Sequence, residues 1–256
     1  MIAAVSTLEQ KQRFLAAARR EPLLHALLGR DLMLWADNPG APVRLFLAGQ
    51  AALSVGSRAA WLAGNPDDPE ELAGFLRFVG VDTLYTSAET PAPGFCKAGR
   101  ERGYCLPPGR RLPQPLQPAG YTLDTALGAG AAAGLLFPYS AADRDGFYSR
   151  TCTAINHGMA LLWGLRDTGG HLAATMGADA LFGGQAYLSL LCTRPHCRRQ
   201  GLGSWLVLAM ANALAARGWQ CVFLSEAHNV DFYRKLGFVP WGGLNVCKDE
   251  KTKRIK

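Results

Sequence analysis

A short segment rich in arginine and glycine stands between an apolar run and a long helical pattern. The apolar run, residues 186–191, predicts a buried strand, and this strand should end near Pro195 because proline cannot donate to a strand ladder. The helical pattern is a row of apolar residues spaced four apart: Leu202, Leu206, Met210 and Leu214. The sequence therefore predicts a strand, a glycine-rich turn and the N-terminus of a helix, in that order.

The predicted turn has the chemistry of a phosphate or pyrophosphate site. A helix start leaves several backbone N–H groups unpaired and carries the positive end of the helix dipole. Gly201 and Gly203 have no Cβ, so a ligand can lie close against the backbone, while Arg198 and Arg199 add positive charge. Together these features predict an anion-binding loop.

Two blocks of the sequence resemble the GNAT acyltransferase family. The first is Arg198-x-x-Gly201-x-Gly203 before a long helix, which is similar to the acyl-CoA-binding motif of that family. The second is Phe232-Tyr233-Arg234-Lys235-Leu236-Gly237-Phe238, which follows an apolar strand pattern at residues 221–226 and looks like the usual close of the fold. The glycine motif alone is a weak signal, but the two blocks in this order are a strong one. The resemblance covers residues 141–241 and is specific to the fold and to CoA binding.

This resemblance implies an α/β fold of the α+β type, namely the GNAT fold, with a mixed, mostly antiparallel central sheet flanked by helices. The chain has 256 residues, which is long for one such domain and favours two tandem domains. We expect an N-terminal α/β domain with a proline-rich linker at residues 1–119. A GNAT catalytic domain that binds acyl-CoA follows at 120–247, and a basic tail at 248–256.

The N-terminal half has a similar order of expected elements. Residues 7–28 predict two helices separated near Pro22, residues 42–64 three antiparallel strands, residues 70–78 a helix and residues 81–86 a strand. This half is either a degenerate GNAT-like copy or an unrelated α+β domain. In place of a CoA loop it has the acidic sequence NPDDPEE, whose charge has the wrong sign for pyrophosphate. If it is a copy, we expect it not to bind CoA.

The remaining segments complete the expected second domain. Residues 91–119 are rich in Pro, Gly, Arg and Lys and predict a linker or irregular structure. Residues 140–157 predict a helix with Ser140 as its N-cap. Residues 159–165 and 171–176 predict two strands joined by a hairpin-like turn.

The resemblance also implies a set of CoA-binding residues. The end of the strand before the loop would give main-chain partners to pantetheine, and the loop would hold the pyrophosphate. These residues are Leu191, Cys192 and Thr193 on the strand, and Arg198, Arg199, Gln200, Gly201, Leu202, Gly203 and Ser204 in the loop. Asn229 is a further candidate, although only two residues separate it from Phe232, fewer than is usual in the family.

Two residues are candidates for the chemistry. Tyr233 matches the family's usual general acid, which protonates the departing thiolate, and a phenol with a pKa of about 10 suits a thiol of similar basicity. The alternative for Tyr233 is a packing aromatic residue. Glu226, at the end of the next strand, is the nearest candidate for a general base, because the strand at residues 186–191 contains no carboxylate. The alternative for Glu226 is a helix cap or a surface ion pair.

The function that the resemblance implies is an acyl-CoA-dependent N-acyltransferase. It would transfer acetyl from acetyl-CoA to a primary amine of a small molecule or peptide, by direct attack in a ternary complex. The alternative is a non-catalytic CoA-binding regulatory protein that lacks a usable base. A net charge of +7 also permits nucleic-acid binding, but the basic residues are dispersed and do not alternate with aromatic ones, so we expect no nucleic-acid partner.

The seven cysteines form no CxxC pair, and Cys96 and Cys105 are the only pair that lies close together within a segment expected to be a loop. We therefore expect neither a metal site nor a disulfide framework. The N-terminus lacks a signal-peptide pattern, and the longest weakly polar run, residues 126–137, is too short to span a bilayer. These features favour a cytoplasmic protein without membrane contact, acting as a monomer or a homodimer.

Overall fold

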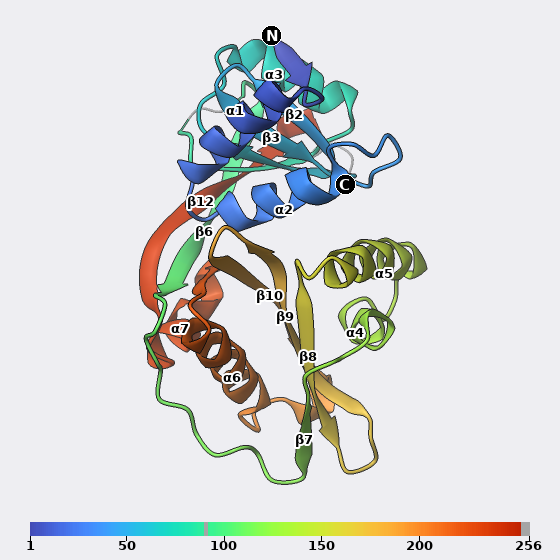
Figure 1. Ribbon diagram of the computed structural model, residues 1–256, viewed down its shortest axis with the longest axis vertical. Helices are drawn as coiled ribbons and strands as arrows, with labels where there is room; N and C mark the ends of the chain where they lie inside the picture. The colour runs from blue at the N-terminus through green and yellow to red at the C-terminus, as the bar shows by residue number, and fades with distance from the viewer. Residues whose placement is uncertain (90–91, 252–256) are drawn as a thin grey trace. The chain divides into compact units, whose positions relative to one another are not determined.

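A computed structural model describes residues 1–89 and 92–251 of the chain, and its contacts divide it into two compact units (Figure 1). Unit 1 comprises Met1–Gly103, Leu224–His228 and Trp241–Lys256, and unit 2 comprises Tyr104–Phe223 and Asn229–Pro240. Each unit is therefore built from segments far apart in the sequence. This division differs from the expected one, which placed a single boundary at residue 119.

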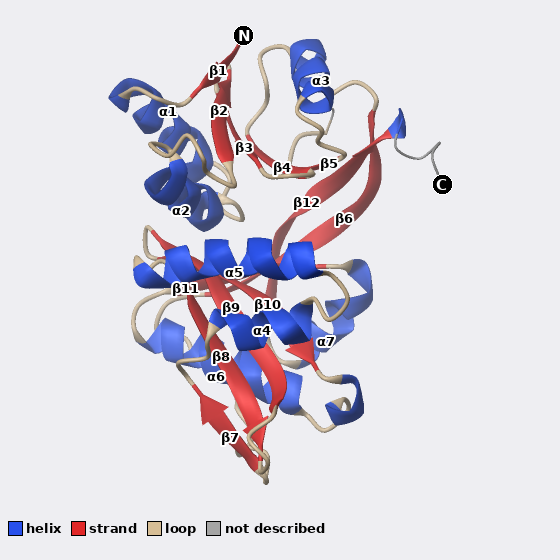
Figure 2. Cartoon of the chain, turned by 90° about the vertical axis from the view of Figure 1, so that its right-hand side faces the viewer, coloured by secondary structure: helices blue, strands red, loops and turns tan. Residues whose placement is uncertain are grey.

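The described part of unit 1 has three α-helices and a sheet. Its elements are β1 (Ile2–Ala4), α1 (Leu8–Arg19), α2 (His25–Trp35), β2 (Arg44–Ala48), β3 (Ala51–Val55), β4 (Ala59–Ala63), α3 (Pro69–Phe78), β5 (Thr83–Thr86), most of β6 (Phe95–Leu106) and most of β12 (Val239–Asp249). Strands β1 to β4 pair antiparallel in sequence order, β4 pairs parallel with β5, and β12 pairs antiparallel with β5. Helices α1 and α2 cover one face of this sheet and α3 covers the other (Figure 2).

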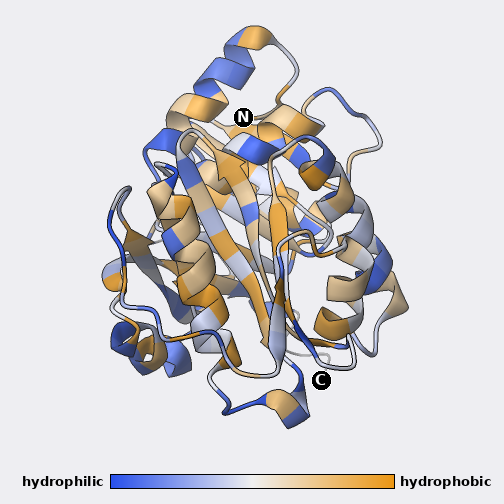
Figure 3. Cartoon of the chain, turned by 60° about the horizontal axis from the view of Figure 1, so that its bottom comes forward, coloured by the Kyte–Doolittle hydropathy of each residue, from blue (hydrophilic) through white to orange (hydrophobic). Residues whose placement is uncertain are grey.

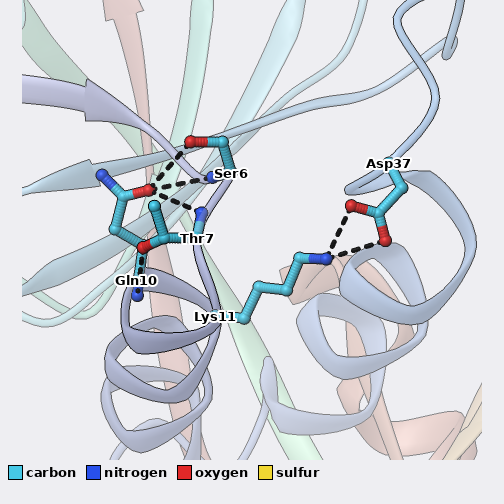
Figure 4. A network of polar contacts seen from close by, with 5 residues as sticks. All are labelled: Ser6, Thr7, Gln10, Lys11 and Asp37. Atoms are coloured by element: carbon cyan, nitrogen blue, oxygen red, sulfur yellow. Dashed lines mark hydrogen bonds and ion pairs between the residues drawn. The ribbon is translucent and has the colours of Figure 1, made fainter.

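The first helix begins with a capping box. The backbone N–H of Gln10 donates to Thr7 Oγ1 at 3.2 Å, and the N–H of Thr7 donates back to Gln10 Oε1 at 3.0 Å (Figure 4). One turn on, Lys11 Nζ lies 2.6 Å from a carboxylate oxygen of Asp37. The predicted break near Pro22 is confirmed, although the second helix continues beyond the predicted end to Trp35.

Unit 2 repeats this architecture. Its elements are β7 (Tyr121–Asp124), α4 (Ala129–Leu136), α5 (Ala141–Asn156), β8 (Leu161–Asp167), β9 (Leu172–Phe182), β10 (Gln185–Thr193), the 3₁₀ turn η1 (Pro195–Cys197), α6 (Leu202–Ala216), β11 (Gln220–Ser225), the 3₁₀ turn η2 (Ala227–Asn229), which continues from unit 1, and α7 (Val230–Lys235). Strands β7 to β10 pair antiparallel, and β10 pairs parallel with β11. Helices α4 and α5 lie on one face of the sheet and α6 on the other (Figures 1 and 2).

The order strand, two helices, three antiparallel strands, helix, parallel strand therefore occurs twice in the chain. The core of each unit consists of apolar residues whose spacing in the sequence predicts a buried face. The row Leu202, Leu206, Met210 and Leu214 of α6 is buried in one cluster with residues of β9 and β10, and the strands are largely apolar along their length (Figure 3). In unit 1, Leu72 and Leu76 of α3 are buried in a cluster with Leu53 and Leu84.

Two expectations about the linker and the tail are wrong. Residues 91–119 contain the long strand β6 as well as a loop, so Cys96 and Cys105 lie on a strand. Lys248 and Asp249, assigned to the basic tail, belong to β12, which pairs with β5 at Val246 and Tyr85. The last five residues of the expected tail, 252–256, lie outside the described residues. Within residues 1–89 and 92–251, no helix is long and apolar enough to cross a bilayer.

Candidate functional site

The end of β10 has an irregular backbone. Its register against β9 shifts by one residue between Ser189 and Cys192, and Leu190 within this bulge has a φ of 63°. The parallel ladder with β11 ends at Tyr187, which pairs with Val222. Beyond that point β10 continues to Thr193, and none of the described ladder pairs of β11 within unit 2 involves these residues. Within unit 2, the main chain of Leu191, Cys192 and Thr193 therefore lies beyond the last paired position of β10 and β11.

The segment between β10 and α6 holds a row of unpaired backbone donors. The N–H groups of residues 199–204 donate to no residue that the structure describes, and the first that does is Trp205, to the carbonyl oxygen of Gly201 at 2.9 Å. Arg199 and Gly201 have φ angles of 61° and 77°, and Gly201 caps α6 without a side-chain hydrogen bond. Six consecutive free N–H groups around a helix start form a nest for an anion.

The side chains around this nest carry matching charge. Arg198 and Arg199 are exposed, and the first turn of α6 contains no acidic residue. Arg198 Nε donates to the carbonyl oxygen of Thr193 at 3.2 Å, which joins the loop to the last residue of β10. Gln200 is held on both sides, because its Oε1 accepts from Tyr121 Oη at 2.9 Å and its Nε2 donates to a carbonyl oxygen at 3.4 Å.

The two glycines of the motif have different roles. A Cβ at Gly201 would meet nothing within 4 Å, so the space above the helix start is open, and the positive φ there favours glycine. A Cβ at Gly203 would lie 3.3 Å from Thr193 Oγ1. Gly203 therefore allows the first turn of α6 to lie close to the end of β10.

The equivalent helix start in unit 1 has the opposite chemistry. Helix α3 follows β4 as α6 follows β10, but Asp68 caps it by accepting from the N–H of Glu71 at 2.9 Å. Pro69 occupies the first helical position, and Glu70 and Glu71 stand in the first turn. The protein's own carboxylates therefore fill the place that an anionic ligand would take.

Tyr233 of α7 belongs to a cluster of aromatic rings in unit 2. Its ring centroid lies 4.6 Å from that of Phe223, 4.9 Å from Phe232 and 5.5 Å from Tyr104. Burial, with a smaller contribution from Tyr104, raises the pKa of Tyr233 to about 12. The phenol therefore keeps its proton throughout the physiological range.

Glu226 and Asn229 occupy less enclosed positions. Glu226 is exposed, belongs to unit 1, and its carboxylate lies 3.3 Å from His228 Nδ1. Asn229 belongs to unit 2 and stands at the N-cap of α7, where its side chain makes no capping hydrogen bond. The structure thus brings together the candidates on β10 and in the loop within unit 2, whereas Glu226 belongs to unit 1.

The family comparison matches this part of the chain. Residues 159–240 match the family model described as "Acetyltransferase (GNAT) domain". This segment of the chain is therefore similar to the GNAT acetyltransferase domain. The match covers the bulged strand, the loop, helix α6 and Tyr233, so the resemblance seen in the sequence is confirmed. No curated protein matches the sequence.

Solved GNAT structures share the fold of both units. A GCN5-related N-acetyltransferase from Kribbella flavida aligns over 91% of this chain and 95% of its own, at 19% identity and a TM-score of 0.62. One from Sphaerobacter thermophilus aligns over 96% and 94%, at 15% identity and a TM-score of 0.63. A tandem GNAT protein from the clavulanic acid biosynthesis pathway aligns over 96% and 97%, at 16% identity and a TM-score of 0.64. The chain therefore has a mixed α/β GNAT fold that extends over both halves.

The candidate site in unit 2 has three features that the sequence did not reveal. The positive φ angles of Leu190 and Arg199 occur at residue types that carry no signal for them. Tyr104, whose ring contacts Tyr233 and whose Oη donates to the carbonyl oxygen of Val230 at 3.4 Å, lies in the segment expected to be a linker. If the sequence had predicted β6 as a strand, Tyr104 would have been a candidate residue of the folded domain instead of a linker residue.

Proposed function

We propose that the protein is an acyl-CoA-dependent N-acyltransferase that transfers acetyl from acetyl-CoA to a primary amine of a small molecule or peptide. The observation that carries this proposal is the row of six free N–H groups at residues 199–204, with Arg198 and Arg199 beside it. Residues 198–204 would hold the pyrophosphate of acetyl-CoA. The main chain of Leu191, Cys192 and Thr193, which lies beyond the last paired position of β10 and β11 in unit 2, would hold the pantetheine arm.

In this proposal the amine attacks the thioester carbonyl, the carbon–sulfur bond breaks, and the thiolate of CoA takes up a proton. Tyr233 is the proposed donor of that proton. A phenol with a pKa of about 12 is a weaker acid than an ordinary tyrosine, so its proton would move only as the thiolate forms. Glu226 is the proposed base for the acceptor ammonium, and Asn229 is a proposed contact of the pantetheine arm.

A second candidate function is CoA binding without catalysis. The observations that favour it are the absence of a carboxylate on β10, the exposed position of Glu226 and the high pKa of Tyr233. A CoA-binding regulator would keep the loop and need none of these groups. Both candidate functions require CoA to bind, and only the acyltransferase would acetylate an amine.

Incubation of the dialysed full-length protein with acetyl-CoA and a panel of primary amines separates them. The product should be detected as acetylated amine by mass spectrometry, because the exposed Cys96 would react with thiol reagents. We expect catalytic acetylation of at least one amine, absent in Arg198→Glu. Saturable binding of acetyl-CoA without turnover on any amine would favour the regulator. No binding of acetyl-CoA would remove both.

A further inference from the structure

Unit 1 contains a cavity of about 390 Å³ that none of the CoA-loop residues line. This volume lies within the range of about 300–1,000 Å³ that is usual for pockets that bind small molecules. The lining residues come from three strands and the segment after β11: Thr83 and Tyr85 of β5, Ala98, Gly99, Arg100 and Glu101 of β6, Val246 and Lys248 of β12, and Glu226 and Ala227.

One wall of the cavity is apolar and aromatic. The strand registers place Ser54, Trp61, Tyr85 and Val246 side by side across four neighbouring strands, on one face of the sheet. At one end of this row, α2 covers the sheet, and Ser54 Oγ donates to Asp31 at 2.9 Å. At the other end, Tyr85 and Val246 line the cavity, and the ring of Tyr85 stacks on Trp61 with centroids 4.1 Å apart. The stacking holds the Tyr85 ring in place.

A half-buried carboxylate, Glu101, also lines the cavity. Its side chain forms no hydrogen bond or ion pair with any residue that the structure describes. Burial and the charge of Glu226 raise its pKa, and no cation contributes to the shift. Two cations, Arg100 and Lys248, line the same cavity, but both are exposed and neither pairs with Glu101. Two residues before it on the same strand, a Cβ at Gly99 would meet nothing within 4 Å, so the cavity wall is open at that position.

An unpaired carboxylate in this position destabilises the folded protein. Removal of a charge from water without a partner is costly, and a carboxylate whose pKa burial raises in a pocket is a candidate for a ligand-binding group. Glu226 is not equivalent, because it is exposed and already lies beside His228. The cavity therefore offers one carboxylate that lacks a counterion and one fixed aromatic ring.

We propose that this cavity of unit 1 binds a small organic cation, whose primary ammonium group pairs with Glu101 and whose ring or alkyl body packs on Tyr85. Ammonium–carboxylate hydrogen bonds are about twice as strong as neutral ones, and an aromatic face adds attraction for a cation. Binding itself is independent of acetyl transfer. If the bound cation is the acyl acceptor, that role rests on the proposed function.

Calorimetric titration of the full-length protein with 2-phenylethylamine, in the absence of acetyl-CoA, tests the proposal. Butylamine and 2-phenylethanol are the matched probes, since the first keeps the ammonium without the ring and the second keeps the ring without the charge. We expect saturable binding of 2-phenylethylamine, weaker binding of butylamine and none of 2-phenylethanol. Glu101→Gln should weaken amine binding at least tenfold, and Glu9→Gln, at an exposed carboxylate of α1, should leave it unchanged.

Thermal unfolding gives an independent measurement on the same variants. Glu101→Gln should unfold at the same temperature as the parent protein or a higher one, because it removes a half-buried charge without a partner. A lower unfolding temperature would show that the carboxylate has a stabilising partner and would contradict the proposal. Equal amine affinity in Glu101→Gln and the parent, or no binding of either amine, would also overturn it. These results do not depend on whether acetyl-CoA binds or turns over.

Discussion

Arg198 Nε donates to the carbonyl oxygen of Thr193 at 3.2 Å, so the first residue of the anion loop is tied to the last residue of β10. The pyrophosphate and pantetheine parts of a CoA ligand would contact opposite ends of this short connection. Arg198 would therefore attract the pyrophosphate through its charge and would hold the end of β10 that contacts the pantetheine through its hydrogen bond.

Arg198→Glu should weaken acetyl-CoA binding at least tenfold. A hydrogen bond to a charged group contributes about 1.5–3 kcal/mol, and reversal of the charge adds repulsion from the pyrophosphate. Calorimetric titration measures the effect. The control is Arg110→Glu, the same change at an exposed arginine outside the loop, which should bind as the parent does. Equal affinity in both variants would remove the CoA site from this loop.

Asp68→Ala should lower the stability of the protein without changing its affinity for acetyl-CoA. Loss of an N-cap costs about 1 kcal/mol, which for a chain of this size lowers the unfolding temperature by about 2–4 °C. Calorimetry should also give one equivalent of acetyl-CoA per chain, because acids fill the helix start of unit 1. Two equivalents, or a change of affinity in Asp68→Ala, would show that unit 1 takes part in CoA binding.

Tyr233→Phe should slow acyl transfer about 10²–10⁴-fold and leave acetyl-CoA affinity nearly unchanged, if Tyr233 is the general acid. The phenylalanine ring can keep the contacts with Phe223 and Tyr104. Single-turnover measurement with an acceptor from the amine panel is needed, because slow product release could hide the loss. A change of about twofold or less, far below this range, would identify Tyr233 as a packing residue.

The raised pKa of Tyr233 predicts a loss of stability at alkaline pH. The unfolded chain releases this proton near pH 10 and the folded protein near pH 12, so stability falls as pH rises through this window. The loss amounts to about 2–3 kcal/mol, since one pKa unit corresponds to about 1.4 kcal/mol. Denaturant unfolding of Tyr233→Phe between pH 9 and 12 should show a shallower decline, whereas Tyr139→Phe, at an exposed tyrosine, should match the parent.

A chain that ends at Pro240 should lose the folded structure of unit 1. This truncation removes the pairing of β12 with β5 and the buried side chains of Leu244 and Cys247. Limited proteolysis should then cleave within residues 1–103. A chain that ends at Lys251 keeps β12 and is the matched control. Equal resistance of the two chains would show that unit 1 does not need β12.

The sequence predicted the fold best where one local rule decided the structure. Helix α6 was predicted because its apolar residues have a clear period, and strand β10 because residues 186–191 form an apolar run. Helix α3 was predicted because apolar residues share one face and acids stand at its start. Strand β6 was missed because two glycines, Gly99 and Gly103, and four charged residues interrupt it. Its extended form depends on tertiary pairing, which no local pattern records.

The candidate site was predicted by residue type but not by backbone geometry. Arg198, Gly201 and Gly203 stand in the sequence, whereas the bulge at Leu190 and the end of the β10–β11 ladder depend on how three strands meet. Glu101 was missed because it lies on β6, which the sequence did not predict as a strand. Its neighbours in the cavity come from β5 and β12, whose pairing joins residues about 160 positions apart in the sequence.

The pairing of β12 with β5 has a consequence for how the protein is made. The residues of β5 leave the ribosome well before those of β12, and at about 5–20 residues per second the interval is roughly 8–30 s. During synthesis, unit 1 therefore waits with one strand missing and an unprotected sheet edge. Its folding can be completed only after residues 239–249 have been translated, so a nascent chain stalled within unit 2 would be a target for chaperones and proteases.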